Sequence, residues 1–318
     1  MRLPALFSVP GDALAGAAAA GAAPNARTLL AVGSSLCLYE AGMALNDWAD
    51  REVDAVERPH RPLPSGRVRP GAALAAAGAL TGAGLALAAA AGRPALAVAA
   101  PLAATVWAYD LGLKHTPAGP VAMGAARGLD LLMGAAATTG RTRPAVPSAA
   151  LLGTHTLAVT TVSRQEAQGG SPLAPLAALA ATALLTRHTA RRPGPPAHDP
   201  ARSAGHGPRP GPTGHRGLRG QAASLATALA GRPGRPDPAA LLTTALVAAY
   251  AAGTARPYVH AALNPSPPLT QRAVGAGIRA TIPLQAALAA RAKGPVSAVL
   301  VAALAPLGAR LAKKVSVT

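Results

Sequence analysis

The chain of 318 residues is poor in aromatic, charged and cysteine residues, all of which a soluble enzyme of this size normally contains. It has one Phe, two Trp and four Tyr, and charged residues make up 13% of it, about half of the ~25% usual in soluble globular domains. The single cysteine, Cys37, excludes an internal disulfide and a thiolate zinc site. So few aromatic side chains offer no stacking platform for nucleic-acid bases, and we attribute the net charge of +18 to basic loops beside anionic lipid headgroups.

Apolar residues make up 50% of the chain and recur in runs from end to end. A soluble all-α protein with buried Ala-rich helices is the alternative, but it would need more charged residues to cover its water-facing sides. The pattern therefore predicts an all-α, polytopic membrane bundle of nine or ten transmembrane helices. The expected spans are Val9–Ala23, Thr28–Leu45, Gly71–Ala91, Pro94–Tyr109, Gly119–Thr138, Val146–Val162, Pro172–Thr186, Ala239–Ala255, Ala273–Ala290 and Pro295–Leu311.

One stretch, residues 187–238, interrupts this pattern because it is rich in Arg, Pro, Gly and His. Its composition predicts a flexible insertion rather than a folded domain. The insertion divides the bundle into an N-terminal part, residues 1–186, and a C-terminal part, residues 239–318. Arg residues concentrate in loop 46–70, which predicts that this loop of a multi-pass protein faces the cytoplasm.

Carboxylates are concentrated at one point of the sequence. Of the twelve acidic residues, five lie within eleven positions at the end of the second apolar span. Asp47, Asp50 and Asp54 are three and four residues apart, so a continuing helix would place them on one face. Hard oxygen ligands of this kind suit Mg²⁺, which also binds substrate phosphates. The alternative is an interfacial turn in which Arg51, Arg58 and Arg61 pair with the acids.

This stretch also resembles a known motif. Asn46 to Asp54 reads N-D-W-A-D-R-E-V-D, and Arg61 to Val68 reads R-P-L-P-S-G-R-V. The two segments resemble the N-D-x-x-D-x-x-x-D motif and the R-P-L-x-x-G-x-V continuation of the UbiA-type prenyltransferase superfamily. The resemblance implies a UbiA-like helix bundle in which Asp side chains and Mg²⁺ hold an isoprenyl diphosphate while its prenyl group is transferred to an acceptor. It also implies that this multi-pass protein is located in the cell membrane.

Carried over by position, the resemblance assigns roles to residues of the first motif and of a second loop. Asp47, Asp50 and Asp54 become the catalytic and metal-binding residues, and Asn46 becomes part of the substrate site. Tyr109 to Lys114 resembles the family's loop between the fourth and fifth spans. Tyr109, Lys114 and Arg61 would then bind substrate, with Lys114 and Arg61 near phosphate oxygens. Two alternatives stay open, since Arg61 suits a structural ion pair and Lys114 suits an interfacial lysine.

The second acidic motif of that family, D-x-x-x-D, is degenerate in this chain. Ser163 and Ala167 occupy the expected Asp positions and leave Glu166 as the carboxylate. We expect Ser163, Arg164 and Glu166 to bind a polar headgroup or the diphosphate directly. The run from Thr161 to Gly170 also resembles the T-x-S-R-x-E-x-x-G-G pattern of the EboC-like branch of the superfamily.

Arg127 and Asp130 lie three residues apart inside the fifth apolar span, where charges are costly. An intrahelical pair is one interpretation, and we expect Asp130 to give structural support.

Two functions follow from the resemblance. The first is a Mg²⁺-dependent transferase whose partners are an isoprenyl diphosphate, an unidentified small acceptor and membrane lipids. The alternative is a non-catalytic UbiA-like protein that binds or transports a lipid-linked or polar metabolite, which the degenerate second motif favours.

Overall fold

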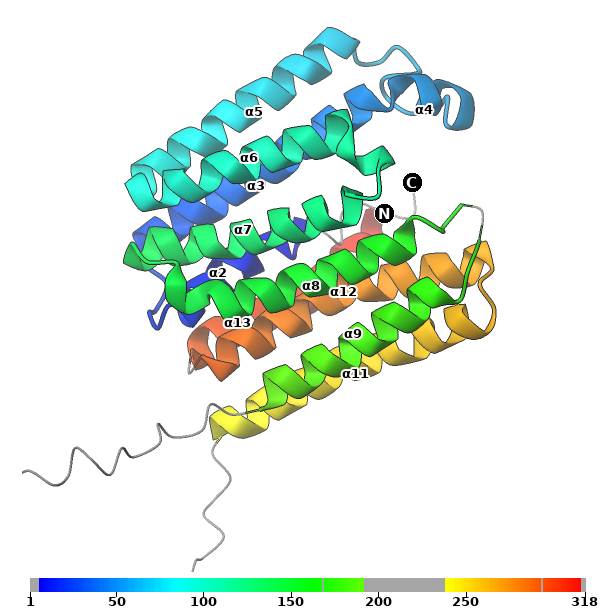
Figure 1. The fold of residues 1–318 in the computed structure, drawn as a ribbon. Helices are drawn as coiled ribbons and strands as arrows, with labels where there is room; N and C mark the ends of the chain where they lie inside the picture. Colours follow the sequence, from blue (N-terminus) through cyan, green and yellow to red (C-terminus); the bar gives the residue numbers. More distant parts are fainter. Residues whose placement is uncertain (1–5, 168, 192–237, 293, 316–318) are drawn as a thin grey trace, which may run out of the picture.

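The computed structural model describes residues 6–167, 169–191, 238–292 and 294–315, and these ranges form a helical bundle that contains no β-strand. Long helices lie side by side and alternate in direction along the chain, with α5 on one outer side and α9 and α11 on the other (Figure 1). The helices are α2 (Val9–Ala19), α3 (Ala26–Ala49), α4 (Arg51–Glu57), α5 (Pro70–Ala91), α6 (Arg93–Leu111), α7 (Gly119–Thr139), α8 (Val146–Ser163), α9 (Leu173–Ala190), α11 (Pro238–Leu263), α12 (Pro267–Arg291) and α13 (Pro295–Val315), and the short 3₁₀ turns are η1 (Leu113–His115) and η2 (Arg143–Ala145).

A helix covers each of the ten predicted apolar spans, so the predicted all-α fold is confirmed. Proline fixes the starts of many of these helices, because it tolerates the first turn, where its missing N–H would be unpaired anyway. It occupies this position in α5, α6, α7, α8 and α12. The start of α3 is fixed differently, by a reciprocal capping box between Asn25 and Thr28.

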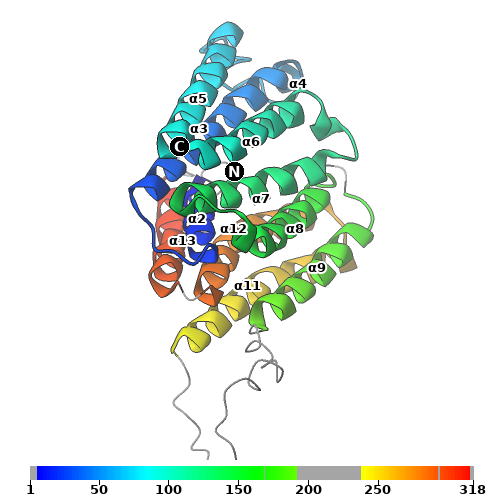
Figure 2. The same ribbon diagram turned by 60° about the vertical axis from the view of Figure 1, so that its left-hand side comes forward.

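Six described helices are long and apolar enough to cross a membrane, which makes the chain a multi-pass membrane protein. In the described part of the chain, α2 and α7 are not among them: α2 has only 11 residues, and α7 carries Arg127 and Asp130. These two helices lie inside the bundle, where α2 packs on α7, α12 and α13 (Figure 2). The six spans are Ala26–Ala49, Pro70–Ala91, Arg93–Leu111, Arg143–Ser163, Pro238–Leu263 and Pro267–Arg291.

The α2–α7 contact depends on glycine. A Cβ atom added to Gly134 would overlap the Cα of Ala13, and one added to Gly16 would overlap the carbonyl oxygen of Leu131. The two backbones therefore touch directly, as small residues allow in packed membrane helices. This close approach brings Asp12 of α2 against Arg127 of α7.

The helix that carries the acidic motif does not continue through it. Helix α3 ends at Ala49, Asp50 is its C-cap, and α4 begins at Arg51. The expected continuous helix with three aspartates on one face is therefore interrupted at Asp50. Hydrogen bonds from Asp50 N to Asn46 O and from Asp54 N to Asp50 O still span the break, so the three residues stay in one neighbourhood.

The predicted insertion at residues 187–238 lies mostly outside the described residues. At its two ends, α9 extends to Ala190 and α11 begins at Pro238. The helical bundle therefore reaches a few residues further than the predicted boundaries at 186 and 239.

Replacing Gly134 by Ala should destabilise the bundle, because the new methyl group has no space against the α2 backbone. We expect a cost of about 1–3 kcal/mol, the usual range for overpacking, and a lower Tm in detergent. Gly82→Ala on α5 is the matched control, because a Cβ there meets nothing within 4 Å. Equal Tm values for the two variants would contradict the close α2–α7 contact.

Candidate functional site

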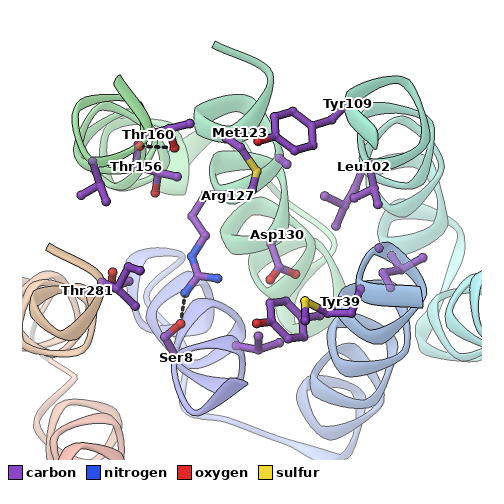
Figure 3. Close-up of a pocket in the computed structure, with 18 of the residues that line it drawn as sticks. Ser8, Tyr39, Leu102, Tyr109, Met123, Arg127, Asp130, Thr156, Thr160 and Thr281 are labelled. Atoms are coloured by element: carbon purple, nitrogen blue, oxygen red, sulfur yellow. Dashed lines mark hydrogen bonds between the residues drawn. The ribbon is translucent and has the colours of Figure 1, made fainter. Parts of the chain in front are cut away.

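A cavity of about 440 Å³ lies between α2, α3, α6, α7, α8 and α12. Its side walls are largely apolar and include Leu38, Leu102, Val106, Met123 and Ile278. Polar side chains line it at two levels along the helices, one at the ends of α3 and α6 next to the acidic motif and one deeper inside, and Figure 3 shows Tyr109, Arg127 and Asp130 around the cavity. Such a cavity can enclose an apolar chain and still hold polar groups in fixed places.

The outer level, which we call the mouth, is formed by Asn46, Tyr109, Asp110 and Ser163. The Asn46 amide nitrogen donates a hydrogen bond to Asp110 Oδ1 at 3.1 Å and thereby joins the ends of α3 and α6. Asp110 is 5% exposed. Asn46, Tyr109 and Ser163 were predicted as substrate-binding residues, and the structure brings all three to one cavity.

Sequence reasoning did not assign a role to Asp110, although it lies inside the Tyr109–Lys114 stretch. One signal was available in the sequence. Asp110 stands at the end of an apolar span, four residues before Lys114. A carboxylate is energetically costly in that position unless it has a partner, so a bonded Asp110 could have been expected.

Asp54 is the most buried carboxylate of the acidic motif. Its side chain is 4% exposed, and it accepts hydrogen bonds from Arg61 at 2.5 Å and from Arg58 at 3.4 Å. Arg61 also lies 4.0 Å from an oxygen of Asp47, so one guanidinium joins two of the three aspartates. In this geometry, Arg61 forms the structural ion pair that the sequence left open.

Asp50 is bound by a cation from another part of the chain. Lys114 of η1 donates a hydrogen bond to Asp50 Oδ1 at 2.6 Å, and the lysine side chain is 9% exposed. The lysine is therefore directed to the acidic motif rather than to the bundle surface. The carboxylates of Asp50 and Asp47 are 28% and 26% exposed, so solvent reaches both.

The carboxylates of the acidic motif suit a magnesium ion that binds together with a phosphate-containing substrate. In the described part of the chain, no group of three or more His, Cys, Asp or Glu side chains is arranged to hold a metal by itself. Mg²⁺ commonly uses only one or two carboxylates and completes its shell with water and substrate phosphates. The partly exposed pair Asp47 and Asp50 meets that requirement, whereas both oxygens of Asp54 already accept from arginines.

The degenerate second motif does not form one group with the first. Ser163 Oγ donates to the Thr160 carbonyl within α8, and Arg164 donates to the Thr116 carbonyl in the loop before α7. Oε1 of Glu166 is buried without a hydrogen-bond partner, and burial raises the pKa of this carboxyl above its ordinary value. Of these three residues, only Ser163 lines the cavity.

The deeper polar level centres on Arg127 and Asp130. Arg127 Nε lies 3.0 Å from Asp12 Oδ2 of α2, so the ion pair joins two helices instead of two positions on α7. Asp130 accepts a hydrogen bond from Ser35 of α3. The sequence identifies Arg127 and Asp130 as charged residues inside a span, but it does not identify their partners, which come from distant parts of the chain.

Comparison with known proteins adds three findings. A model of the UbiA prenyltransferase family matches residues 8–191. The digeranylgeranylglyceryl phosphate synthase of Methanopyrus kandleri is 39% identical over 98 residues, which cover 31% of this chain and 36% of that protein. The protoheme IX farnesyltransferase of Thermosynechococcus vestitus is 38% identical over 144 residues, 44% of this chain and 45% of that protein. The chain thus matches less than half the length of these relatives.

Solved structures share the fold over nearly the whole chain. A structure described as that of a digeranylgeranylglyceryl phosphate synthase in membranes superposes with a TM-score of 0.57 at 16% identity, covering 92% of this chain and 97% of that one. The apo structure of a UbiA homologue from Aeropyrum pernix K1 gives a TM-score of 0.54 at 20% identity, covering 86% and 96%. At these identities the likeness concerns the fold.

Arg61→Ala should destabilise the protein, because it removes the closer of the two cations that neutralise buried Asp54. Since Arg58 remains, we expect a loss of about 1–3 kcal/mol, less than that of a wholly unpaired buried charge. Glu52→Ala is the control, because Glu52 is 85% exposed and an exposed pair such as Arg51–Glu52 contributes at most about 1 kcal/mol. Thermal unfolding in detergent measures both, and equal Tm values would show that the Arg61–Asp54 contact is not important for stability.

Proposed function

This chain belongs to the UbiA prenyltransferase family, and from that membership we propose that it is a Mg²⁺-dependent intramembrane transferase. It would move an isoprenyl group from an isoprenyl diphosphate to a small acceptor. The observation that carries the proposal is the position of the acidic motif at the mouth: Asn46, next to Asp47 in the sequence, lines a largely apolar cavity. A diphosphate held at the motif would have its prenyl chain at the entrance to that cavity.

In this proposal, Asp47 and Asp50 hold Mg²⁺ together with diphosphate oxygens. Bound Mg²⁺ supplies charge neutralisation for the departing diphosphate. Lys114 lies against Asp50 and would share its charge with a phosphate oxygen as the diphosphate leaves. Asp54 keeps Arg61 in place, so that Arg61 approaches the phosphate from the Asp47 side.

The cavity walls would perform the remaining tasks of the reaction. The C–O bond to the diphosphate breaks with its electron pair on oxygen, and a positive charge develops on the allylic carbon. Tyr109 lines the mouth, and its ring can stabilise that charge through its π face. Apolar walls exclude water, so the carbon is captured by the acceptor, which loses a proton as the new bond forms.

A non-catalytic relative is the second candidate, and one observation favours it. At the end of α8 the family's second acidic pair is replaced by Ser163 and Ala167, and Ser163 already donates to a helix carbonyl. A binding or transport protein could keep a single binding site for magnesium and diphosphate at Asp47 and Asp50 without breaking the C–O bond. We also propose the cell membrane as the location, with the mouth facing the cytoplasm.

Diphosphate release tests the proposal. Purified protein in nanodiscs is incubated with isoprenyl diphosphates of several lengths and a mixture of small acceptors, with Mg²⁺ or with a chelator. We expect release that requires Mg²⁺ and that falls by about 100-fold or more in Asp50→Asn, because one metal ligand and the Lys114 partner are lost together.

Glu52→Gln is the matched control, since this neighbouring carboxylate is 85% exposed and contacts Arg51. It should retain the wild-type rate. Mg²⁺-dependent binding of the diphosphate without release would support the non-catalytic candidate. Absence of both binding and release would remove the isoprenyl diphosphate as the substrate.

A further inference from the structure

The deeper level of the cavity contains a network of polar groups that the binding of a diphosphate at the mouth does not involve. We call it the inner polar group and define it as Ser8, Asp12, Ser35, Arg127, Asp130 and Gln285. Ser35 and Asn46 both belong to α3 and both line the cavity, eleven residues apart, which corresponds to about 16 Å along a helix. The inner polar group is therefore separate from the mouth.

The contacts within this group are short and come from four elements. Arg127 lies 3.0 Å from Asp12 and donates to Ser8 Oγ at 2.5 Å, as Figure 3 shows for Ser8. Gln285 of α12 donates to Asp12 Oδ1 at 2.5 Å. Asp12 is fully buried and Asp130 is 8% exposed, yet Arg127 and Asp130 both line the cavity. Ionisable groups inside a membrane bundle are costly, and those that face a cavity commonly mark a ligand path.

The charges of the inner polar group do not suit an anionic ligand. The Arg127 guanidinium is already paired with Asp12, while Asp130 adds a second carboxyl group. Nearby, His155 contacts the Gly277 carbonyl through Nε2 and the Tyr250 hydroxyl through Nδ1, and a neutral imidazole satisfies both contacts by donating through one nitrogen and accepting through the other. In the inner polar group the two carboxyl groups thus at least balance the single guanidinium, even where they share a proton.

The groups that remain available are mainly hydrogen-bond acceptors. Asp130 accepts a hydrogen bond from Ser35 and shares one with Asp12, which leaves further lone pairs of its carboxyl oxygens for a ligand, and hydroxyl groups of Thr156, Thr160 and Thr281 line the same space. An alcohol or amine would donate a hydrogen bond to Asp130, whereas a carboxylate or phosphate would be repelled by it.

We propose that the inner polar group, through Asp130, binds the acceptor by a neutral or cationic hydrogen-bond donor, an alcohol or an amine, and excludes acceptors that carry a free carboxylate or phosphate. This inference rests on the proposed function: the donor group of the acceptor would be held at the deeper end of the cavity, and the reactive atom at the other end of the acceptor would point to the allylic carbon near the mouth. It also separates this chain from a transferase whose acceptor is an acid.

Three probes of one size and shape test the inference: para-ethylbenzyl alcohol, para-ethylbenzylamine and para-ethylbenzoate. Their binding to the full chain in nanodiscs is measured by calorimetry, in the presence of Mg²⁺ and an isoprenyl diphosphate. We expect the alcohol and the amine to bind about tenfold tighter than the benzoate, because of the charge of Asp130. Equal binding, or tighter binding of the benzoate, would overturn the inference.

Asp130→Asn is the diagnostic variant, since the amide still accepts from Ser35 but has no charge. It should reduce the amine-to-benzoate preference about tenfold, whereas Glu52→Gln should leave that preference unchanged. A preference that is unchanged in Asp130→Asn would also overturn the inference. If Asp130→Asn does not fold, the ranking of the three probes on the wild-type protein still decides.

The same samples separate the two proposals. Mg²⁺-dependent binding of the diphosphate is recorded beside the probe titrations. Loss of diphosphate binding with the probe ranking intact would reject prenyl transfer and support a donor-selective inner site. Normal diphosphate binding with a flat or inverted ranking would reject the inner site alone.

Discussion

A charged side chain inside an apolar bundle needs a partner, and this requirement organises both polar levels of the molecule. Asp54 is held by two arginines and Asp50 by Lys114, while Arg127 is held by Asp12. Except for the local Asp54–Arg58 contact at the end of α4, these pairs join a helix to a loop or to another helix. The ion pairs therefore fix where helix ends and loops meet, and the cavity lies between the segments that they join.

The two levels divide the cavity by chemistry. Beside the mouth, the partly exposed carboxylates of Asp47 and Asp50 lie against an arginine and a lysine, an arrangement that can exchange ions with solution. The middle is lined by Leu, Val and Met side chains, which suit apolar groups. The inner polar group is buried and its guanidinium is already neutralised, so it suits a neutral or cationic donor.

The fold was largely predictable because a membrane requires long apolar helices, and these are recognisable in the sequence as long apolar runs. The proximity of candidate residues was predictable where they are close in sequence, as for Asn46 and Asp50, which a backbone hydrogen bond joins. The break at Asp50 could not be predicted, because Arg51 to Glu57 is itself helical and only the cap geometry shows the interruption.

Contacts between distant segments were also beyond the sequence. Nothing local indicates that Asp110 meets Asn46, that Lys114 meets Asp50, or that Arg127 selects Asp12 instead of Asp130 on its own helix. These choices depend on which helix faces lie together, and the Gly134 contact that brings α2 onto α7 is one of the features that decide them.

The pairing of Asp12 has a consequence for biosynthesis. Asp12 lies in α2, and its hydrogen-bond partner Gln285 lies 273 residues later in the chain. Ser8, just before α2, is 119 residues from its own partner, Arg127. A ribosome that synthesises the chain in order makes both partners long after α2 has emerged. Helix α2 therefore reaches its final bonds only when α7 and then α12 have entered the membrane, so closure of the cavity is a late step of assembly.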